Sequence, residues 1–108
     1  MKLATPCEEA FKVEVPILRT AIAKTLVERG MPVVKASKIV GISATTYEKN
    51  IKEKKEEVEK VLMDEEIRDM IEALAGRILA NQTVETTSFC MLCATARKLF
   101  NLPPCPLY

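Results

Sequence analysis

Residues 33–52, VVKASKIVGISATTYEKNIK, predict two short helices joined by a tight turn. The first helix has apolar residues at helical spacing: Val33, Ala36, Ile39 and Val40. Gly41 is expected to end this helix, because glycine readily adopts the left-handed conformation of a tight turn. Ser43 can cap the second helix, and Tyr47 and Ile51 lie one turn apart on its inner face.

The flanking segments also have helical periodicity. Residues 16–30, PILRTAIAKTLVERG, predict a core helix that stops at Gly30. Its inner positions are Ile17, Leu18, Ala21, Ile22, Thr25 and Leu26. A second apolar stripe follows the turn region: Val58, Val61, Leu62, Ile67, Met70, Ile71, Leu74 and Ile78. The stripe changes phase near Asp64, so we expect either one kinked helix or two helices with Asp64 as a cap. Since no segment alternates as a strand does, the predicted fold class is all-α.

The pair of helices in residues 33–52 has the features of a DNA-binding helix-turn-helix. That motif requires small residues in its first helix, a glycine at the turn and apolar residues between the helices. Ala36, Ser37 and Gly41 meet the first two requirements. Lysines cluster in the same region: Lys35, Lys38, Lys49, Lys52, Lys54 and Lys55. An ordinary helical hairpin would show the same apolar pattern, but the lysine cluster favours a polyanion partner.

The predicted DNA contacts lie on both helices. Ser43, Thr45 and Thr46 suit base edges, thymine methyl groups or phosphates, and Asn50 would read adenine if it faced outward. Lys35 is a further expected DNA contact, and the lysines expected to contact phosphates are Lys38, Lys49, Lys52, Lys54 and Lys55. Glu48, within the second helix, counts against a tight interface.

The four cysteines, in a chain without histidine, indicate a metal site: Cys7, Cys90, Cys93 and Cys105. Cys90 and Cys93 are one turn apart in a last helix that we expect Ser88 to cap and Phe100 to end. A 4Fe–4S cluster accepts one CxxC pair plus two scattered cysteines, and it is the interpretation we favour. Tetrahedral zinc with four cysteine ligands is the alternative, and a disulfide or free thiols is a third. Cys7 also suits an ordinary buried position.

The chain resembles the small archaeal helix-turn-helix regulators that also occur fused in front of thiamine-phosphate synthase domains. The matching segments are PCEEAFKVEVPILRTAIAKTLVERG, ASKIVGISATTYEKNI, DEEIRDMIEALAGRIL, CMLC and the final cysteine. The resemblance implies a lambda-repressor-like domain that binds DNA as a homodimer, with the cysteines forming a sensing or structural metal site. Because no synthase domain follows, we expect a stand-alone regulator.

These features divide the chain into four expected regions. Residues 1–15 form an N-terminal helix carrying Cys7, capped by Thr5 with Pro6 and Glu8 behind it. Residues 16–57 form the helix-turn-helix core, and residues 58–82 a long helix for packing or dimerisation. Residues 83–108 form the cysteine-bearing helix and tail. The N-terminal and C-terminal segments of the chain would meet at the metal site.

Composition narrows the function. The 108 residues carry a net charge of +1, and no apolar run approaches the roughly 20 residues of a membrane span. The N-terminus lacks a signal-peptide core, so we expect a cytoplasmic protein without membrane partners. Without histidine or a glycine-rich phosphate loop, catalysis and a small-molecule substrate are not expected. We therefore predict a transcriptional regulator of double-stranded DNA. The alternatives are a small iron–sulfur electron-transfer protein and a zinc-stapled interaction module.

Overall fold

The computed structural model describes residues 14–82 and 86–100, with the side chains of residues 86–90 and 100 excepted. All regular elements in these ranges are helices, which confirms the all-α class. In chain order they are α2 (Glu14–Glu28), α3 (Val33–Val40), α4 (Ala44–Glu53), α5 (Lys55–Met63), α6 (Glu65–Leu79), α7 (Thr86–Ala96) and the 3-10 helix η1 (Arg97–Phe100).

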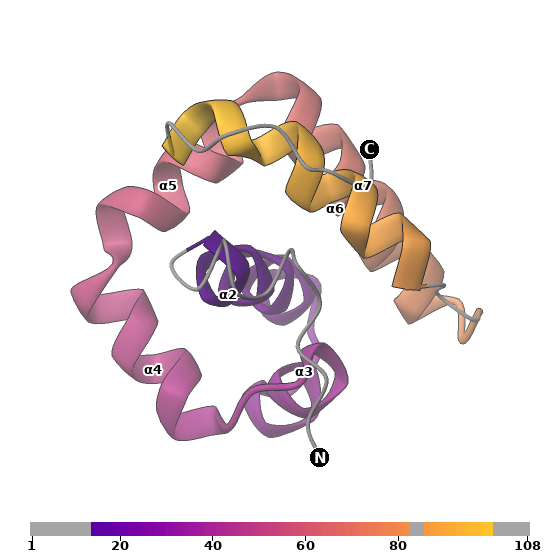
Figure 1. The fold of residues 1–108 in the computed structure, drawn as a ribbon. Helices are drawn as coiled ribbons and strands as arrows, with labels where there is room; N and C mark the ends of the chain where they lie inside the picture. Colours follow the sequence, from indigo (N-terminus) through magenta and orange to yellow (C-terminus); the bar gives the residue numbers. More distant parts are fainter. Residues whose placement is uncertain (1–13, 83–85, 101–108) are drawn as a thin grey trace, which may run out of the picture.

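Helix α2 lies at the centre of the fold, and α3, α4, α5, α6 and α7 surround it (Figure 1). Ten of its 15 residues are buried, including all six positions that the sequence predicted to face the core. A helix enclosed by neighbours has no solvent side, so its apolar residues are not confined to one narrow stripe. Burial of this helix is the main apolar contribution to the core.

Two buried threonines in α2 satisfy their hydroxyl groups within the helix. The Thr20 hydroxyl donates to the Pro16 carbonyl at 2.8 Å, and the Thr25 hydroxyl donates to the Ala21 carbonyl at 3.0 Å. A buried hydroxyl without a hydrogen-bond partner is costly, and these bonds to the preceding turn remove that cost. Thr20 and Thr25 can therefore occupy core positions.

Glycines end α2 and α3 as predicted. Gly30 has φ 103° and Gly41 has φ 85°, both in the left-handed region. After Gly41, the Ile42 N–H donates to the Ser37 carbonyl at 3.0 Å, which closes the last turn of α3. The chain thus reverses direction between α3 and α4 over three residues.

The inner face of α3 differs from the prediction at one position. Ile39 was expected to face the core, but it is 44 % exposed. Ser37 is buried instead, at 1 % exposure, beside Ala36 at 0 %. Positions 33, 36, 37 and 40 form a regular helical face, so the small serine occupies the place where the pattern calls for an apolar residue. Small side chains at 36 and 37 allow α3 to lie close to α2.

Asp64 separates two helices, which decides between the alternatives left open by the sequence. Its Oδ1 atom accepts a hydrogen bond of 3.1 Å from the Ile67 N–H, as an N-cap residue does. Val58 and Val61 of α5 are buried, as are Ile67, Ile71 and Leu74 of α6. The change of phase in the apolar stripe is therefore the corner between α5 and α6.

Helix α7 begins at Thr86, so the prediction that Ser88 caps it is wrong. Thr86, Thr87 and Ser88 are all suited to helix starts, and the sequence offers no physical reason to choose the last of them. Cys90 is consequently the fifth residue of the helix and Cys93 the eighth.

Two lysines form contacts between η1 and the corner where α5 meets α6. Lys60 Nζ donates to the Leu99 carbonyl at 2.8 Å, and Lys98 Nζ lies 3.7 Å from Asp64 Oδ2. These contacts hold η1 against α5 and the start of α6. Elsewhere on the surface, Arg29 at the end of α2 pairs with Glu72 of α6.

The expected N-terminal cap at Thr5 and the ligands Cys7 and Cys105 lie outside the described residues. Among the helices that are described, none has the length and hydropathy needed to cross a bilayer.

Candidate nucleic-acid interface

Helix α4 presents one polar face to solvent. Tyr47 is buried and Ile51 half-buried on its inner side, where α4 contacts α2 and α3. The residues on the opposite side are all exposed: Thr45, Glu48, Lys49 and Lys52. Their spacing of three, four and seven residues places them in a single stripe along the helix. The structure therefore brings together three of the predicted DNA contacts with Glu48 among them.

Ser43 and Thr46 form the cap of α4. The Ser43 hydroxyl accepts from the Thr46 N–H at 3.0 Å and donates to the Thr46 hydroxyl at 2.8 Å. This confirms the predicted role of Ser43 as the N-cap. Because both hydroxyls take part in the cap, their first role is to define where α4 begins, and Thr45 is the threonine of this stripe that is exposed and has no such bond.

Asn50 is turned toward the core of the protein. Its Nδ2 atom donates a hydrogen bond of 3.0 Å to the Thr20 hydroxyl, across the contact between α4 and α2. The outward orientation that adenine recognition requires is therefore not the one observed. Position 50 follows Tyr47 by three residues, so both side chains lie on the same side of α4.

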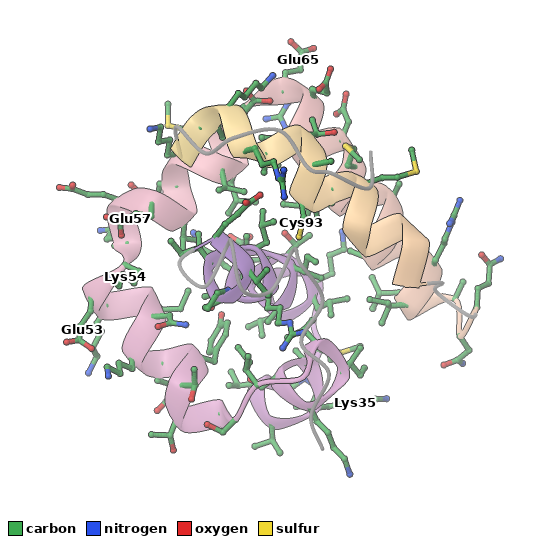
Figure 2. All side chains as sticks on the ribbon, viewed as in Figure 1. Lys35, Glu53, Lys54, Glu57, Glu65 and Cys93 are labelled. Atoms are coloured by element: carbon green, nitrogen blue, oxygen red, sulfur yellow. The ribbon has the colours of Figure 1, made fainter. Side chains whose placement is uncertain are left out.

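Helix α3 carries two further predicted DNA contacts. Lys35 and Lys38 are both exposed, and Figure 2 shows Lys35 projecting outward from α3. Val34, at 70 % exposure, is the most exposed apolar residue of α3. At the other end of α4, Glu53 and Lys54 mark the corner with α5 (Figure 2).

Arg19 is a cation near the turn that the sequence analysis missed. A Cβ atom placed on Gly41 would lie 3.5 Å from Arg19 Nη1, so the guanidinium of α2 sits beside the α3–α4 turn. The available signal was its position: Arg19 is the only charged residue between Pro16 and Lys24 in an otherwise apolar helix. A charge in such a segment must reach the surface or a polar partner.

Tyr47 is the described residue whose pKa departs clearly from its usual value. Burial, which disfavours the charged phenolate, raises its pKa above 10.0, and the nearby Glu28 carboxylate adds to that effect. The phenol therefore stays neutral and fills the space between α4 and α2. This gives α4 an aromatic anchor in the core.

The structure places one of the four cysteine sulfurs. Cys93 is 2 % exposed and points from α7 toward α2 (Figure 2). The side chain of Cys90 lies outside the description, as do Cys7 and Cys105. Within residues 14–82 and 86–100, no three potential ligands among His, Cys, Asp and Glu come together as a metal site. Of the four predicted ligands, Cys93 is therefore the one whose side chain the structure describes.

Comparisons with protein-family models, with curated proteins and with solved structures give no match to this chain.

Proposed function

We propose that this protein is a transcriptional regulator that binds double-stranded DNA, with α3, the turn at Gly41 and α4 as a helix-turn-helix. The observation that carries the proposal is the outer stripe of α4, where Thr45, Lys49 and Lys52 are exposed on a helix that Tyr47 and Asn50 fix to the core. A rigid helix with a basic outer face is the shape that enters a major groove.

The charges around this stripe support the same proposal. Lys35 and Lys38 add two exposed cations on α3. The exposed carboxylates of α6 belong to a different helix: Glu65, Glu66 and Asp69. This separation orients the molecule, because the acidic helix is repelled by phosphates while the basic pair is attracted. The homodimer expected from the resemblance is part of this proposal, since two copies of α4 would read two half-sites.

The four cysteines form the second part of the proposal. We propose that Cys7, Cys90, Cys93 and Cys105 hold a 4Fe–4S cluster, with zinc as the alternative. The donor set supports it, since it consists of thiols without histidine. The burial of Cys93 beside Leu92 and Ala96, both at 0 % exposure, supports it as well, because an apolar surrounding protects such a cluster from solvent. The cluster would supply redox or oxygen sensitivity. Cys93 itself contributes a thiolate that faces α2.

The DNA-binding proposal is tested by measuring affinity for a mixed-sequence duplex over a range of salt concentrations. Phosphate contacts of Lys35, Lys38, Lys49 and Lys52 should together contribute about −3.6 to the slope of log affinity against log salt, at about 0.9 per contact. Fluorescence anisotropy of a labelled duplex gives both quantities. A wild-type protein without salt-dependent binding would contradict the proposal.

Two adjacent substitutions on α4 make the test specific to this face. Lys49→Gln should make the slope of log affinity against log salt less steep by about 0.9, because it removes one phosphate contact. Glu48→Gln should have the opposite effect on affinity and bind severalfold more tightly, because it removes a negative charge from the same exposed stripe. If both variants bound as the wild type does, α4 would not be the DNA-contacting element.

A further inference from the structure

A groove of about 270 Å³ lies where α2, α4 and α5 meet. Three different helices each provide a lysine to its lining: Lys24 from α2, Lys52 from α4 and Lys55 from α5. Ile51 and Val58 supply the apolar part, and Glu59 is the acidic member of the described lining. Three lysines and one glutamate leave a net charge of +2 on the groove. Cations from three separate helices therefore converge on this groove.

Lys24 reaches this groove from the central helix. It is half-buried and stands one turn after Thr20, the residue that bonds Asn50 of α4. Both positions therefore lie on the side of α2 that faces α4. A lysine can bury its methylene stem along apolar surface while its ammonium stays in water. In this way the central helix, which is otherwise enclosed, contributes a charge to the surface.

We propose that this groove holds a backbone phosphate of the DNA that α4 binds, with Lys24 as its innermost cation; this inference rests on the function proposed above. Lys52 belongs both to the outer stripe of α4 and to the groove lining. The groove is therefore continuous with the proposed interface. A strand that follows the outer face of α4 meets Lys52 first and the groove next.

The composition of the lining favours a phosphate of the DNA backbone over a free phosphate ion. The described lining has no hydroxyl, amide or guanidinium side chain. Sites that hold free phosphate surround it with directional donors such as arginine forks and backbone N–H groups. Lysines act as point charges, which suits neutralisation of a strand that other contacts already position. The groove therefore adds affinity without adding sequence preference.

The test compares Lys24→Gln with Lys24→Arg in the full chain. Fluorescence anisotropy on a mixed-sequence duplex over a range of salt concentrations gives the slope of log affinity against log salt. For Lys24→Gln this slope should be less steep by about 0.9, and the affinity should be about eightfold lower at about 0.1 M salt. Lys24→Arg should keep the wild-type slope, because it keeps the charge. Arg77→Gln is the matched control, since Arg77 is exposed on α6 and lines none of this groove. Circular dichroism establishes that each variant is folded.

The outcomes separate this inference from the proposed function. If Lys24→Gln kept the wild-type slope while Lys49→Gln lowered it, the groove would hold no phosphate, although α4 would still bind DNA. Inorganic phosphate at constant ionic strength provides a further arm. Should it bind to the wild type and not to Lys24→Gln without displacing DNA, the groove would be a site for free phosphate and the inference would be overturned. No effect of inorganic phosphate, together with the loss of slope, supports a backbone contact.

Discussion

The side chain of Asn50 donates a hydrogen bond of 3.0 Å to the hydroxyl of Thr20, which in turn donates to the Pro16 carbonyl at 2.8 Å. This short chain of bonds joins α4 to the central helix. Tyr47 lies buried one turn away on the same side of α4, so a polar and an apolar contact act together. They determine which face of α4 is left for solvent, and therefore which residues can meet DNA.

Replacing either partner of this bond should destabilise the protein. Thr20→Val leaves the Asn50 amide without its acceptor and should cost about 1–3 kcal/mol, whereas Asn50→Ala should cost about 1 kcal/mol. Urea unfolding of both single variants and the double variant measures their coupling. Asn50→Ala should also weaken DNA binding equally on all sequences. The substitution disturbs the orientation of α4 but removes no contact with a base. A changed base preference with unchanged stability would show that Asn50 reads DNA.

The two glycines at positions 41 and 76 should respond in opposite ways to alanine. Gly41 has φ 85°, a conformation that costs an alanine about 1–2 kcal/mol, so Gly41→Ala should lower the free energy of unfolding. Gly76 lies inside α6, and an added Cβ would meet nothing within 4 Å. Gly76→Ala should therefore raise stability by about 0.5–1 kcal/mol. Thermal unfolding compares them, and equal signs would contradict the assigned turn.

Tyr47 should make stability decline at alkaline pH. Its pKa is raised in the folded protein, so the folded state holds the phenolic proton more tightly than the unfolded state, whose tyrosine has a pKa near 10.0. The resulting contribution is complete below that pH and is lost as pH rises through the higher folded pKa. Tyr47→Phe should remove this part of the decline in urea midpoints measured from neutral to alkaline pH. Parallel curves for the two proteins would show that Tyr47 does not cause it.

Cys93 allows a test that separates a metal ligand from an ordinary core residue. Anaerobically prepared protein should contain about four irons per chain and absorb broadly in the visible range, and Cys93→Ala should lose both. If Cys93 is a ligand, Cys93→Ala should lower the stability of the metal-loaded protein much more than that of chelator-treated protein. An equal loss in both preparations, with iron content unchanged, would make Cys93 a core residue only. Zinc without iron would favour the alternative metal.

The sequence was informative where one residue type has one physical use. Gly41 as the turn residue and Ser43 as a cap were predicted and are observed, and Asp64 as a cap was one of the two alternatives. Apolar spacing likewise predicted the buried positions of α2, because period and burial are directly linked. These features follow from local chemistry, which a sequence displays.

The predictions failed where several residues were equally suitable or where the tertiary contact decides. Thr86, Thr87 and Ser88 are all good first residues of a helix, so the start of α7 was misplaced. Asn50 faces inward because Thr20 of another helix offers an acceptor, which spacing within α4 does not show. The groove at Lys24 was missed for the same reason, since Lys24 comes from a helix that is distant in sequence from Lys52 and Lys55.

Chemical-shift mapping of backbone amides on addition of duplex DNA tests the central claim most directly. If α3 and α4 form the DNA-binding element, the largest changes should occur at Thr45, Lys49 and Lys52, with smaller ones at Lys35 and Lys38. The chemical shifts of the amides of exposed acidic residues of α6, such as Glu66 and Asp69, should not change. Changes concentrated on α6, or no change at all with DNA in excess, would contradict the account.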